Sequence, residues 1–342
     1  MIKTVAIVSL SHGTIGEDFA KHELLLGLSR LRAYGLNVKF TDNALKGHDY
    51  LKAHPEKRAE DLIQAFRDDE VDMILCAIGG DDTFRLLPYL FENDELKNAV
   101  CNKIFLGFSD TTVNHFMLNK VGLNTFYGQS FLADICELED ELLPYTKKYF
   151  EELILTGTIK EITPSDVWYE SRTDFSKEQM GVKLKAHKNK GFELLQGSSV
   201  FCGKIFGGCI ETIFDMLNGE WYKESPVLCQ KYGLFPDVDF WKGKILLLES
   251  SEEKISPHKY RQALEAIRST GIFDVISGMI IGKPMDEAYY EEYKKLLVEV
   301  VADRELPIVY NVNAGHALPR CIIPFGVDAK VDVNNQKIIF TE

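Results

Sequence analysis

Several features that mark secreted, zinc-binding or membrane-spanning proteins are missing from this chain of 342 residues. Its seven cysteines are an odd number and contain no C-x-x-C pair, which argues against a disulfide framework and against a zinc site. No apolar run approaches the roughly 20 residues that a membrane span needs. The first ten residues combine one lysine with a short β-rich run and lack a small-residue cleavage site. We therefore expect a first strand, no signal peptide and a cytoplasmic protein.

Positive charge is also scarce. The chain has 39 lysines and arginines against 52 aspartates and glutamates, a formal net charge of −13. Such a chain repels a phosphate backbone, so nucleic acid is not an expected partner. The remaining composition, with 45% hydrophobic residues, is that of a globular protein, and the length exceeds the usual size of one core. We therefore expect two domains and no association with a membrane.

The first part of the chain alternates short β-branched runs with segments of helical period. This alternation predicts a parallel sheet covered by helices. The expected strands are 4–10, 36–40, 71–78 and 104–108, and the expected helices are 18–34, 55–69, 83–91 and 111–121. Active sites of such sheets collect at the carboxyl ends of the strands, so the residues that follow each strand are the first to consider.

Ser109 follows one of these strands. The stretch Lys103–Thr112 is typical of a strand, a tight turn and a helix, with the serine at the tip of the turn. A Gly-x-Ser turn projects the hydroxyl above the sheet edge and leaves the N–H of Asp110 at a helix N-terminus. Ser109 is therefore a candidate nucleophile. Serine and aspartate are also ordinary helix caps, and this stretch alone leaves both interpretations open.

The segment Gly79-Gly-Asp-Asp-Thr83 follows the preceding strand directly. It has three interpretations: a plain strand-to-helix turn, a phosphate loop of a nucleotide-dependent kinase, or a source of backbone N–H groups. Asp82 stands where a phosphate loop would carry glycine, and a carboxylate beside phosphate is unfavourable. We prefer the third interpretation, in which the Gly80 N–H is an oxyanion donor beside Ser109.

A serine hydrolase also needs an imidazole and an acceptor that orients it. His316 lies just past an expected strand end and follows Gly315, which permits an unusual turn. Glu249 ends a β-rich strand. The alternatives are a histidine that caps a loop and a glutamate that opens the acidic loop 249–253. The order Ser109, Glu249, His316 assigns the nucleophile to one domain and its base and orienter to the other.

The periodic pattern is interrupted by a polar stretch at 163–197 and resumes after it. We therefore expect an N-terminal parallel-sheet, three-layer α/β domain with a nucleophile elbow at 1–162, a connector and substrate loop at 163–197, and a smaller mixed α/β domain at 198–342. In the last part we expect a strand, glycine turn and helix over 203–212, strands at 243–249, 278–281 and 307–312, helices at 257–270 and about 289–304, and antiparallel strands at 322–333 and 337–341 that turn at Asn334-Asn335.

Four of these motifs resemble the signature of the LD-carboxypeptidase family of serine peptidases: Gly107-Phe-Ser-Asp-Thr-Thr112, Gly79-Gly80, Leu247-Leu-Glu249 and Gly315-His316. Four further stretches are similar to its microcin C immunity (self-resistance) branch: Leu86-Leu-Pro-Tyr89, Tyr127-Gly-Gln-Ser130, Gly282-Lys-Pro-Met-Asp286 and Asn311-Val-Asn313. The resemblance covers nearly the whole chain in the same order.

This resemblance implies a Ser-Glu-His triad in which Ser109 is the nucleophile, His316 the base and Glu249 the orienter. It also implies an oxyanion hole formed by the N–H groups of Gly80 and Asp110, a cytosolic homodimer, and catalysis without a metal ion or cofactor. Because a base must be neutral, kcat/KM should fall on the acid side around a pKa of roughly 6 to 7.

The implied reaction is hydrolysis through an acyl-enzyme of the amide or acyl-phosphoramidate-type bond of a microcin C-like peptidyl or aminoacyl nucleotide. The alternative is an LD-carboxypeptidase that removes a terminal D-amino acid from peptidoglycan tetrapeptides. A nucleotide-dependent kinase lacks the expected glycine and a lysine near Gly79–Thr83. A non-catalytic binding protein is a further alternative, and it predicts no dependence on Ser109.

Three residues are candidate substrate contacts: Trp168, Asp81 and Arg320. The region after Trp168 varies within the family and governs substrate choice. A purine could stack on the indole of Trp168, and the basic run Lys183–Lys190 could face a phosphate or sulfamoyl group. Alternatively, Trp168 anchors the loop to its own domain.

Overall fold

The computed structural model describes residues 1–303 and 305–341. These residues form two compact units. The first unit comprises Met1–Thr158 and Arg172–Lys183, and the second comprises Ile159–Ser171 and the chain from Leu184 onward. In the described ranges, no helix is both long enough and apolar enough to cross a membrane.

The first unit is built on a parallel sheet with the strand order β5-β4-β3-β1-β2. Its strands are β1 (Thr4–Val8), β2 (Asn37–Phe40), β3 (Met73–Cys76), β4 (Ile104–Gly107) and β5 (Phe126–Tyr127). Every residue of β1, β3 and β4 is buried, as expected for parallel strands covered on both faces. The predicted parallel sheet is therefore confirmed.

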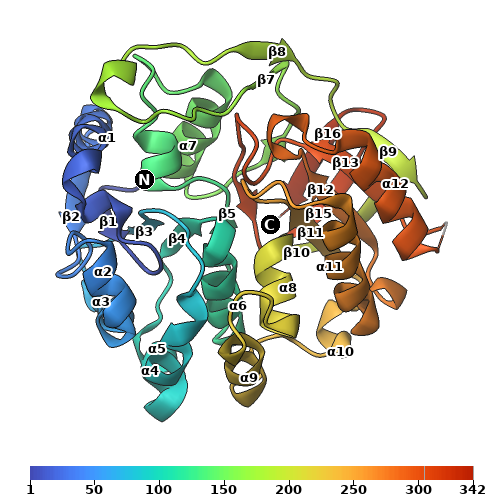
Figure 1. Ribbon diagram of the computed structural model, residues 1–342, viewed down its shortest axis with the longest axis horizontal. Helices are drawn as coiled ribbons and strands as arrows, with labels where there is room; N and C mark the ends of the chain where they lie inside the picture. The colour runs from blue at the N-terminus through green and yellow to red at the C-terminus, as the bar shows by residue number, and fades with distance from the viewer. Residues whose placement is uncertain (304, 342) are drawn as a thin grey trace. The chain divides into compact units, whose positions relative to one another are not determined.

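Helices cover both faces of this sheet, with α7 on one side and α3 to α6 on the other (Figure 1). The helices are α1 (Lys21–Ala33), α2 (His48–Ala53), α3 (Pro55–Arg67), α4 (Leu87–Phe91), α5 (Glu95–Ala99), α6 (Thr112–Lys120) and α7 (Pro144–Thr156). Two of the predicted helices begin with 3-10 turns, at Asp18–Ala20 and at Thr83–Leu86. The second of these turns belongs to the loop that approaches Ser109.

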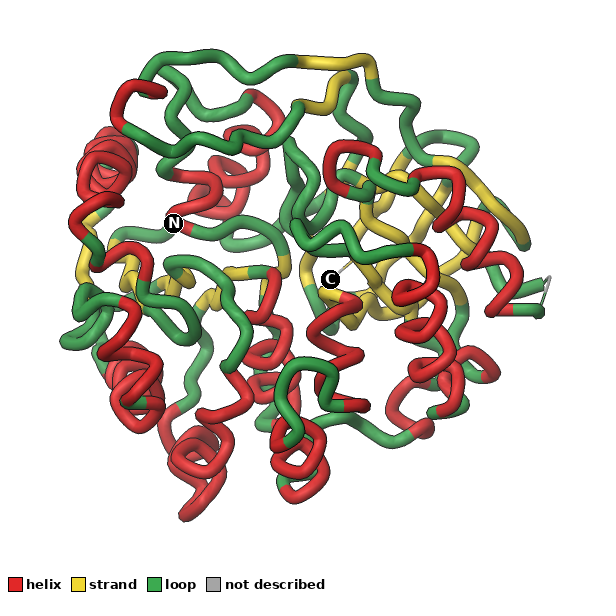
Figure 2. Tube along the Cα trace, in the orientation of Figure 1, coloured by secondary structure: helices red, strands yellow, loops and turns green. Residues whose placement is uncertain are grey.

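The second unit contains an eight-stranded mixed sheet with the order β6-β16-β15-β10-β11-β12-β13-β9, drawn in yellow in Figure 2. Strands β10 to β13 are parallel to one another and the flanking strands pair antiparallel. The strands of this sheet are β6 (Glu161–Ile162), β9 (Glu193–Gln196), β10 (Val200–Cys209), β11 (Ile245–Glu249), β12 (Gly278–Gly282), β13 (Ile308–Val312), β15 (Asp328–Asp332) and β16 (Lys337–Thr341). The short β14 (Ile323–Pro324) is not one of them. The predicted mixed domain with antiparallel strands at its end is confirmed.

Helices α8 (Ile210–Asn218), α11 (Pro257–Ser269) and α12 (Tyr290–Val301) pack side by side in this unit, and α9 (Glu224–Lys231) contacts α8. The short α10 (Val238–Trp241) precedes β11. Ser256 caps α11 by accepting the Lys259 N–H, and Pro257 follows at the first helical position, where proline is favoured. Arg304, the predicted end of the helix that begins near Tyr289, lies outside the described residues.

Two expectations differ from the structure. The predicted glycine turn within 203–212 is wrong, because Gly207 and Gly208 continue β10 to Cys209. A Cβ on Gly207 would lie 2.0 Å from the Leu247 carbonyl oxygen, so glycine is needed for close strand approach. The stretch 163–197 is also more regular than a loop, because it holds β9 and the antiparallel pair β7 (Val167–Tyr169) and β8 (Ala186–Lys188).

Candidate active site

Ser109 occupies a strained turn at the end of β4. Its φ angle is +66°, in a region that residues with a side chain rarely adopt. Its backbone N–H donates to the Tyr127 hydroxyl at 3.2 Å, and a 3-10 turn over Ser109–Thr111 leads into α6. This is the conformation that a nucleophile elbow requires. The plain helix-cap interpretation does not explain the positive φ, and no side chain caps this turn.

The side chain of Asp110 joins the loops that follow three strands of the first unit. Its Oδ2 atom accepts hydrogen bonds from the Ser11 hydroxyl at 2.6 Å, the Thr83 hydroxyl at 2.6 Å and the Thr83 N–H at 2.9 Å. Burial raises the pKa of Asp110 to about 6, although these hydrogen bonds oppose the shift. The residue after the candidate nucleophile is therefore fixed through its side chain.

A buried ion pair ties two of these loops, those after β1 and β3, to α3. Arg58 of α3 donates to Asp82 at 2.5 Å, and the two side chains are 0% and 4% exposed. Arg58 also donates to the carbonyl oxygens of Leu10 and Ser11 at 3.2 and 3.3 Å. Because Asp82 lies next to Thr83, the ion pair and the Asp110 network together fix the Gly79–Thr83 segment. This arrangement also explains why Asp82 occupies a position where a phosphate loop would have glycine.

Gly79 and Gly80 permit a close approach of this segment to its neighbours. A Cβ on Gly79 would lie 2.6 Å from the Ser109 Cβ, and one on Gly80 would lie 2.2 Å from the Ser11 hydroxyl oxygen. Gly80 also has a φ of +151°, which favours glycine. The predicted oxyanion donor Gly80 is thus in the segment that packs against Ser109.

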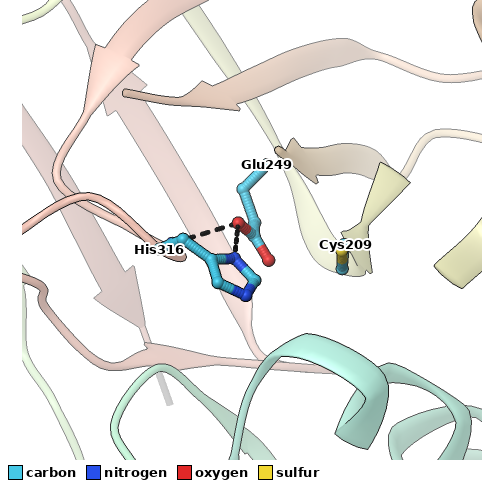
Figure 3. Close-up of side chains that lie close together, drawn as sticks. All are labelled: Cys209, Glu249 and His316. Carbon is cyan, nitrogen blue, oxygen red and sulfur yellow. Dashed lines mark hydrogen bonds and ion pairs between the residues drawn. The ribbon is translucent and has the colours of Figure 1, made fainter. Parts of the chain in front are cut away.

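Glu249 and His316 form a hydrogen-bonded pair in the second unit (Figure 3). The Oε2 atom of Glu249 lies 2.7 Å from His316 Nδ1 and also accepts the His316 N–H at 3.1 Å. Glu249 is the last residue of β11, and His316 follows Gly315, whose φ is +84°. A Cβ on Gly315 would lie 2.1 Å from the same Oε2 atom. Glu249 and His316 are therefore hydrogen-bonded to each other, and their roles as orienter and base stay predictions.

Glu252 provides a second carboxylate that contacts the His316 imidazole, and it is not among the site residues predicted from the sequence. Its Oε2 atom lies 3.0 Å from His316 Nε2. Desolvation alone would lower the pKa of His316, but the charges and hydrogen bonds of Glu249 and Glu252 raise it to about 10. The same contact lowers the pKa of Glu252. The Glu252 side chain is 60% exposed, so solvent weakens this contact relative to that of the buried Glu249. The raised pKa differs from the expected titration near 6 to 7, which assumed an unperturbed ring, and the pH dependence of kcat/KM stays a prediction.

Another histidine of the protein is excluded as the base. His115 is buried in α6, and its two ring nitrogens lie 2.7 Å from the Thr125 hydroxyl and 3.1 Å from the Gly107 carbonyl oxygen. Burial lowers the pKa of His115 to about 3. It is a core residue that supports the strand before Ser109.

A cluster of three residues in the second unit has the donor types of a transition-metal site. Cys209, Glu249 and His316 each offer a ligand atom, and these atoms lie within 4.8 Å of one another. Nδ1 of His316 is already bonded to Glu249, and burial raises the pKa of the Cys209 thiol well above its usual value. A metal ion would have to displace both the hydrogen bond and the thiol proton, so these residues do not form a prepared metal site.

The three candidate substrate contacts lie in different surroundings. Trp168 is 8% exposed, its ring stacks on His187 at 4.4 Å, and Lys283 Nζ lies 5.0 Å from its centroid. This geometry favours the interpretation of Trp168 as an anchor. Arg320 is buried and donates to the His316 carbonyl oxygen at 3.2 Å, whereas Asp81 is exposed. The role of all three in binding substrate stays a prediction.

A serine in an elbow and a histidine oriented by a buried carboxylate are the parts of a serine hydrolase. The comparison with known families agrees: the LD-carboxypeptidase N-terminal domain matches residues 5–128, and the LD-carboxypeptidase C-terminal domain matches residues 202–331. The chain belongs to this family of peptidases.

Its relatives include a putative carboxypeptidase of Treponema pallidum, which is 30% identical over 320 residues, or 90% of this chain and 84% of that protein. A crystal structure of an MccF-like protein from Streptococcus pneumoniae in complex with AMP is 60% identical, with a TM-score of 0.99 over 100% of this chain and 99% of that one. The microcin C7 self-immunity protein MccF in complex with aspartyl sulfamoyl adenosine has the same fold, with 23% identity and a TM-score of 0.79 over 99% and 96% of the two chains.

Proposed function

We propose that the protein is a cytosolic serine peptidase or amidase that cleaves a microcin C-like peptidyl or aminoacyl nucleotide through an acyl-enzyme. The observation that supports this substrate class most strongly is the AMP complex of the Streptococcus pneumoniae relative, because that protein is 60% identical over the full length of this chain. A protein so similar that accommodates a nucleoside monophosphate favours a nucleotide leaving group.

In the proposed mechanism, the Ser109 hydroxyl attacks the acyl carbon and its proton passes to His316 Nε2. Nε2 is assigned to this step because Nδ1 is bonded to Glu249. Since Nε2 lies 3.0 Å from Glu252 in this structure, the step requires the neutral ring with Nε2 released from that carboxylate. The N–H groups of Gly80 and Asp110 stabilise the oxyanion, and each such donor contributes about 3 kcal/mol in known hydrolases. Collapse breaks the bond to the leaving group, which takes the proton from His316. Water then hydrolyses the acyl ester, with His316 again as the base.

An LD-carboxypeptidase that removes a terminal D-amino acid from peptidoglycan tetrapeptides is the second candidate. The match to both domains of the LD-carboxypeptidase family favours it. The chemistry of the Ser109 step would be the same, and only the group on each side of the scissile bond would differ. The two candidates are therefore separated by substrate and not by mechanism.

The test is mass spectrometry of the protein after incubation with a panel of aminoacyl-sulfamoyl adenosines and LD-tetrapeptides. We expect release of the amino acid from the nucleotide analogues at a kcat/KM at least tenfold above that for tetrapeptides. Ser109→Ala should abolish turnover, whereas the matched control Ser269→Ala, at an exposed serine of α11, should not change it. Preferential tetrapeptide cleavage would establish the carboxypeptidase instead, and turnover of neither class would refute both.

Two further expectations belong to this proposal. We propose a homodimer, which light scattering coupled to size exclusion would test, and catalysis without a metal ion or cofactor. Dialysis against EDTA should then leave kcat unchanged. A loss of activity that Zn²⁺ restores would contradict the proposed role of His316 as a proton acceptor. It would instead favour a metal site formed by Cys209, Glu249 and His316.

A further inference from the structure

A second buried carboxylate lies beside the Glu249–His316 pair. Glu211 is 2% exposed and is the second residue of α8. Its Oε1 atom accepts the N–H of Ser251 at 2.9 Å and the Ser251 hydroxyl at 3.0 Å, and its Oε2 atom lies 3.3 Å from the Cys209 thiol. Three donors thus converge on one carboxylate that has no part in the mechanism described above.

The sheet register explains why Glu211 lies there. Cys209, the last residue of β10, pairs with Glu249, the last residue of β11. The chain after β10 enters α8 at once, and the chain after β11 turns through Ser250 and Ser251 to Glu252. Glu211 therefore bridges two adjacent strand ends, and its contact with Ser251 lies between the two residues whose carboxylates bind the nitrogens of His316.

We propose that Glu211 is a positioning residue that fixes the Ser250–Glu252 turn and, through its negative charge, stabilises the imidazolium form of His316. It does not touch the reacting atoms. This role rests on the proposed function, in which His316 becomes positively charged whenever it accepts the serine proton. Cys209 places the two groups near each other, because its thiol lies 3.3 Å from Glu211 Oε2 and within 4.8 Å of a ring nitrogen of His316. In a medium of low dielectric, a charge at such a separation interacts with the imidazolium more strongly than in water.

The titration of Glu211 agrees with this geometry. Burial and the charge of Glu249 raise the pKa of Glu211 to about 7, and the charge of His316 opposes the shift. Interactions of this kind are reciprocal, so an ionised Glu211 favours protonated His316. The other titratable or charged groups that face this region from the neighbouring elements are Cys209, Glu249, Glu252, Tyr260, Tyr293 and Arg320.

The experiment compares the wild-type protein with Glu211→Gln, which keeps the size of the side chain and removes its charge. Nuclear magnetic resonance of histidine-labelled protein without substrate would follow the titration of His316. We expect its pKa to fall by about one unit in Glu211→Gln, a tenfold change in the protonation equilibrium. With substrate, kcat should fall about tenfold at constant KM, and the acid limb of kcat/KM should move to lower pH. Glu211→Asp retains the charge and should restore most of the His316 titration.

Glu23→Gln is the matched control. Glu23 is also buried, and desolvation together with the charge of Glu137 raises its pKa to about 7, but it belongs to the first unit. It should leave the His316 titration unchanged. An unchanged His316 pKa in a folded Glu211→Gln protein would overturn the proposal.

Wild-type protein provides a readout that does not depend on the folding of a variant. Because burial and the charge of Glu249 raise the pKa of Glu211 to about 7, the His316 resonance should shift a second time near that pH, and its absence would also overturn the proposal. Neither resonance measurement requires turnover. A protein that shows the coupling but cleaves no substrate would therefore refute the proposed function and leave the electrostatic role intact.

Discussion

The strand ends of the two units carry polar residues of opposite electrostatic character. In the first unit, the carboxylates of Asp82 and Asp110 are matched by Arg58 and by hydroxyl and N–H donors, all of them buried. In the second unit, His316 lies between Glu249 and Glu252, with Glu211 close by. The first arrangement fixes backbone, because its groups hold three loops together. The second arrangement favours the protonated form of His316, because its carboxylates raise the pKa of that imidazole.

This difference predicts different effects of substitutions in the two units. Loss of a partner in the first unit leaves a buried charge uncompensated and should appear mainly as instability. Loss of a carboxylate in the second unit should appear mainly as a changed pH dependence. The predictions below test this division, beginning with the largest expected effect.

The strongest test asks whether one residue from each unit acts in the same step. Ser109→Ala and His316→Ala should each lower kcat by about 10⁴-fold or more, and the double variant should be hardly worse than either single one, because the residues of a triad act as a unit. Steady-state kinetics on the same substrate would measure all three. Additive losses in the double variant would mean that the two units contribute to separate steps.

The second prediction tests the buried network of the first unit. Arg58→Ala should lower the free energy of unfolding by about 3–5 kcal/mol, because it leaves Asp82 charged and buried without its partner. Urea denaturation followed by circular dichroism would measure the loss. The control is Arg67→Ala, which breaks the exposed pair with Glu95, whose side chains are 57% and 45% exposed. Such a pair contributes about 0–1 kcal/mol, so similar losses in both variants would contradict the division.

The third prediction concerns the β7–β8 pair of the second unit. Trp168→Leu should lower the free energy of unfolding by about 2 kcal/mol, because a buried ring is replaced by a smaller side chain. Since the ring stacks on His187, KM for aminoacyl-sulfamoyl adenosines and for tetrapeptides should change by the same factor. Trp221→Leu, at a tryptophan that is 41% exposed, is the control for stability. A tenfold rise in KM for the nucleotide alone would restore the base-stacking role of Trp168.

The sequence was sufficient to predict those structural elements that depend on neighbouring residues in the chain. The parallel strands of the first unit follow from alternating β-branched and helical segments, and the cap at Ser256 follows from its position before Pro257. Ser109, Glu249 and His316 could be selected because each stands at a strand end. The glycines of β10 were misjudged because only the neighbouring β11, 40 residues further on, shows that they serve close strand approach.

The electrostatic surroundings of these residues could not be read from the sequence. Glu252 belongs to an acidic loop that is indistinguishable in composition from a solvated turn, and only the fold brings it to His316 Nε2. Arg58 likewise lies in an ordinary amphipathic helix, 24 residues before the partner that it contacts. A pKa depends on such non-local partners and on burial, which is why the sequence could suggest Glu249 and His316 as neighbours but not the raised pKa of His316.

The last prediction follows from that titration and has the smallest expected effect. With a pKa of about 10, His316 is protonated at neutral pH, so kcat/KM should rise with pH up to about 10 and not level off near 7. Glu252→Gln removes one of the two carboxylates and should move the acid limb about one unit lower. Glu253→Gln, at an exposed neighbour, should leave it in place.

The pH dependence of stability provides an independent check of the protonation of His316. Because folding raises the pKa of His316, its contribution to the free energy of unfolding is fully present below the unfolded value of about 6.5 and is lost as the pH rises through about 10. Urea denaturation of the wild-type protein should therefore show decreasing stability over this range, and the decrease should be smaller in Glu252→Gln. Equal pH dependence in the two proteins would mean that Glu252 does not act on His316, and the contrast between the two units would then rest on Glu249 and Glu211 alone.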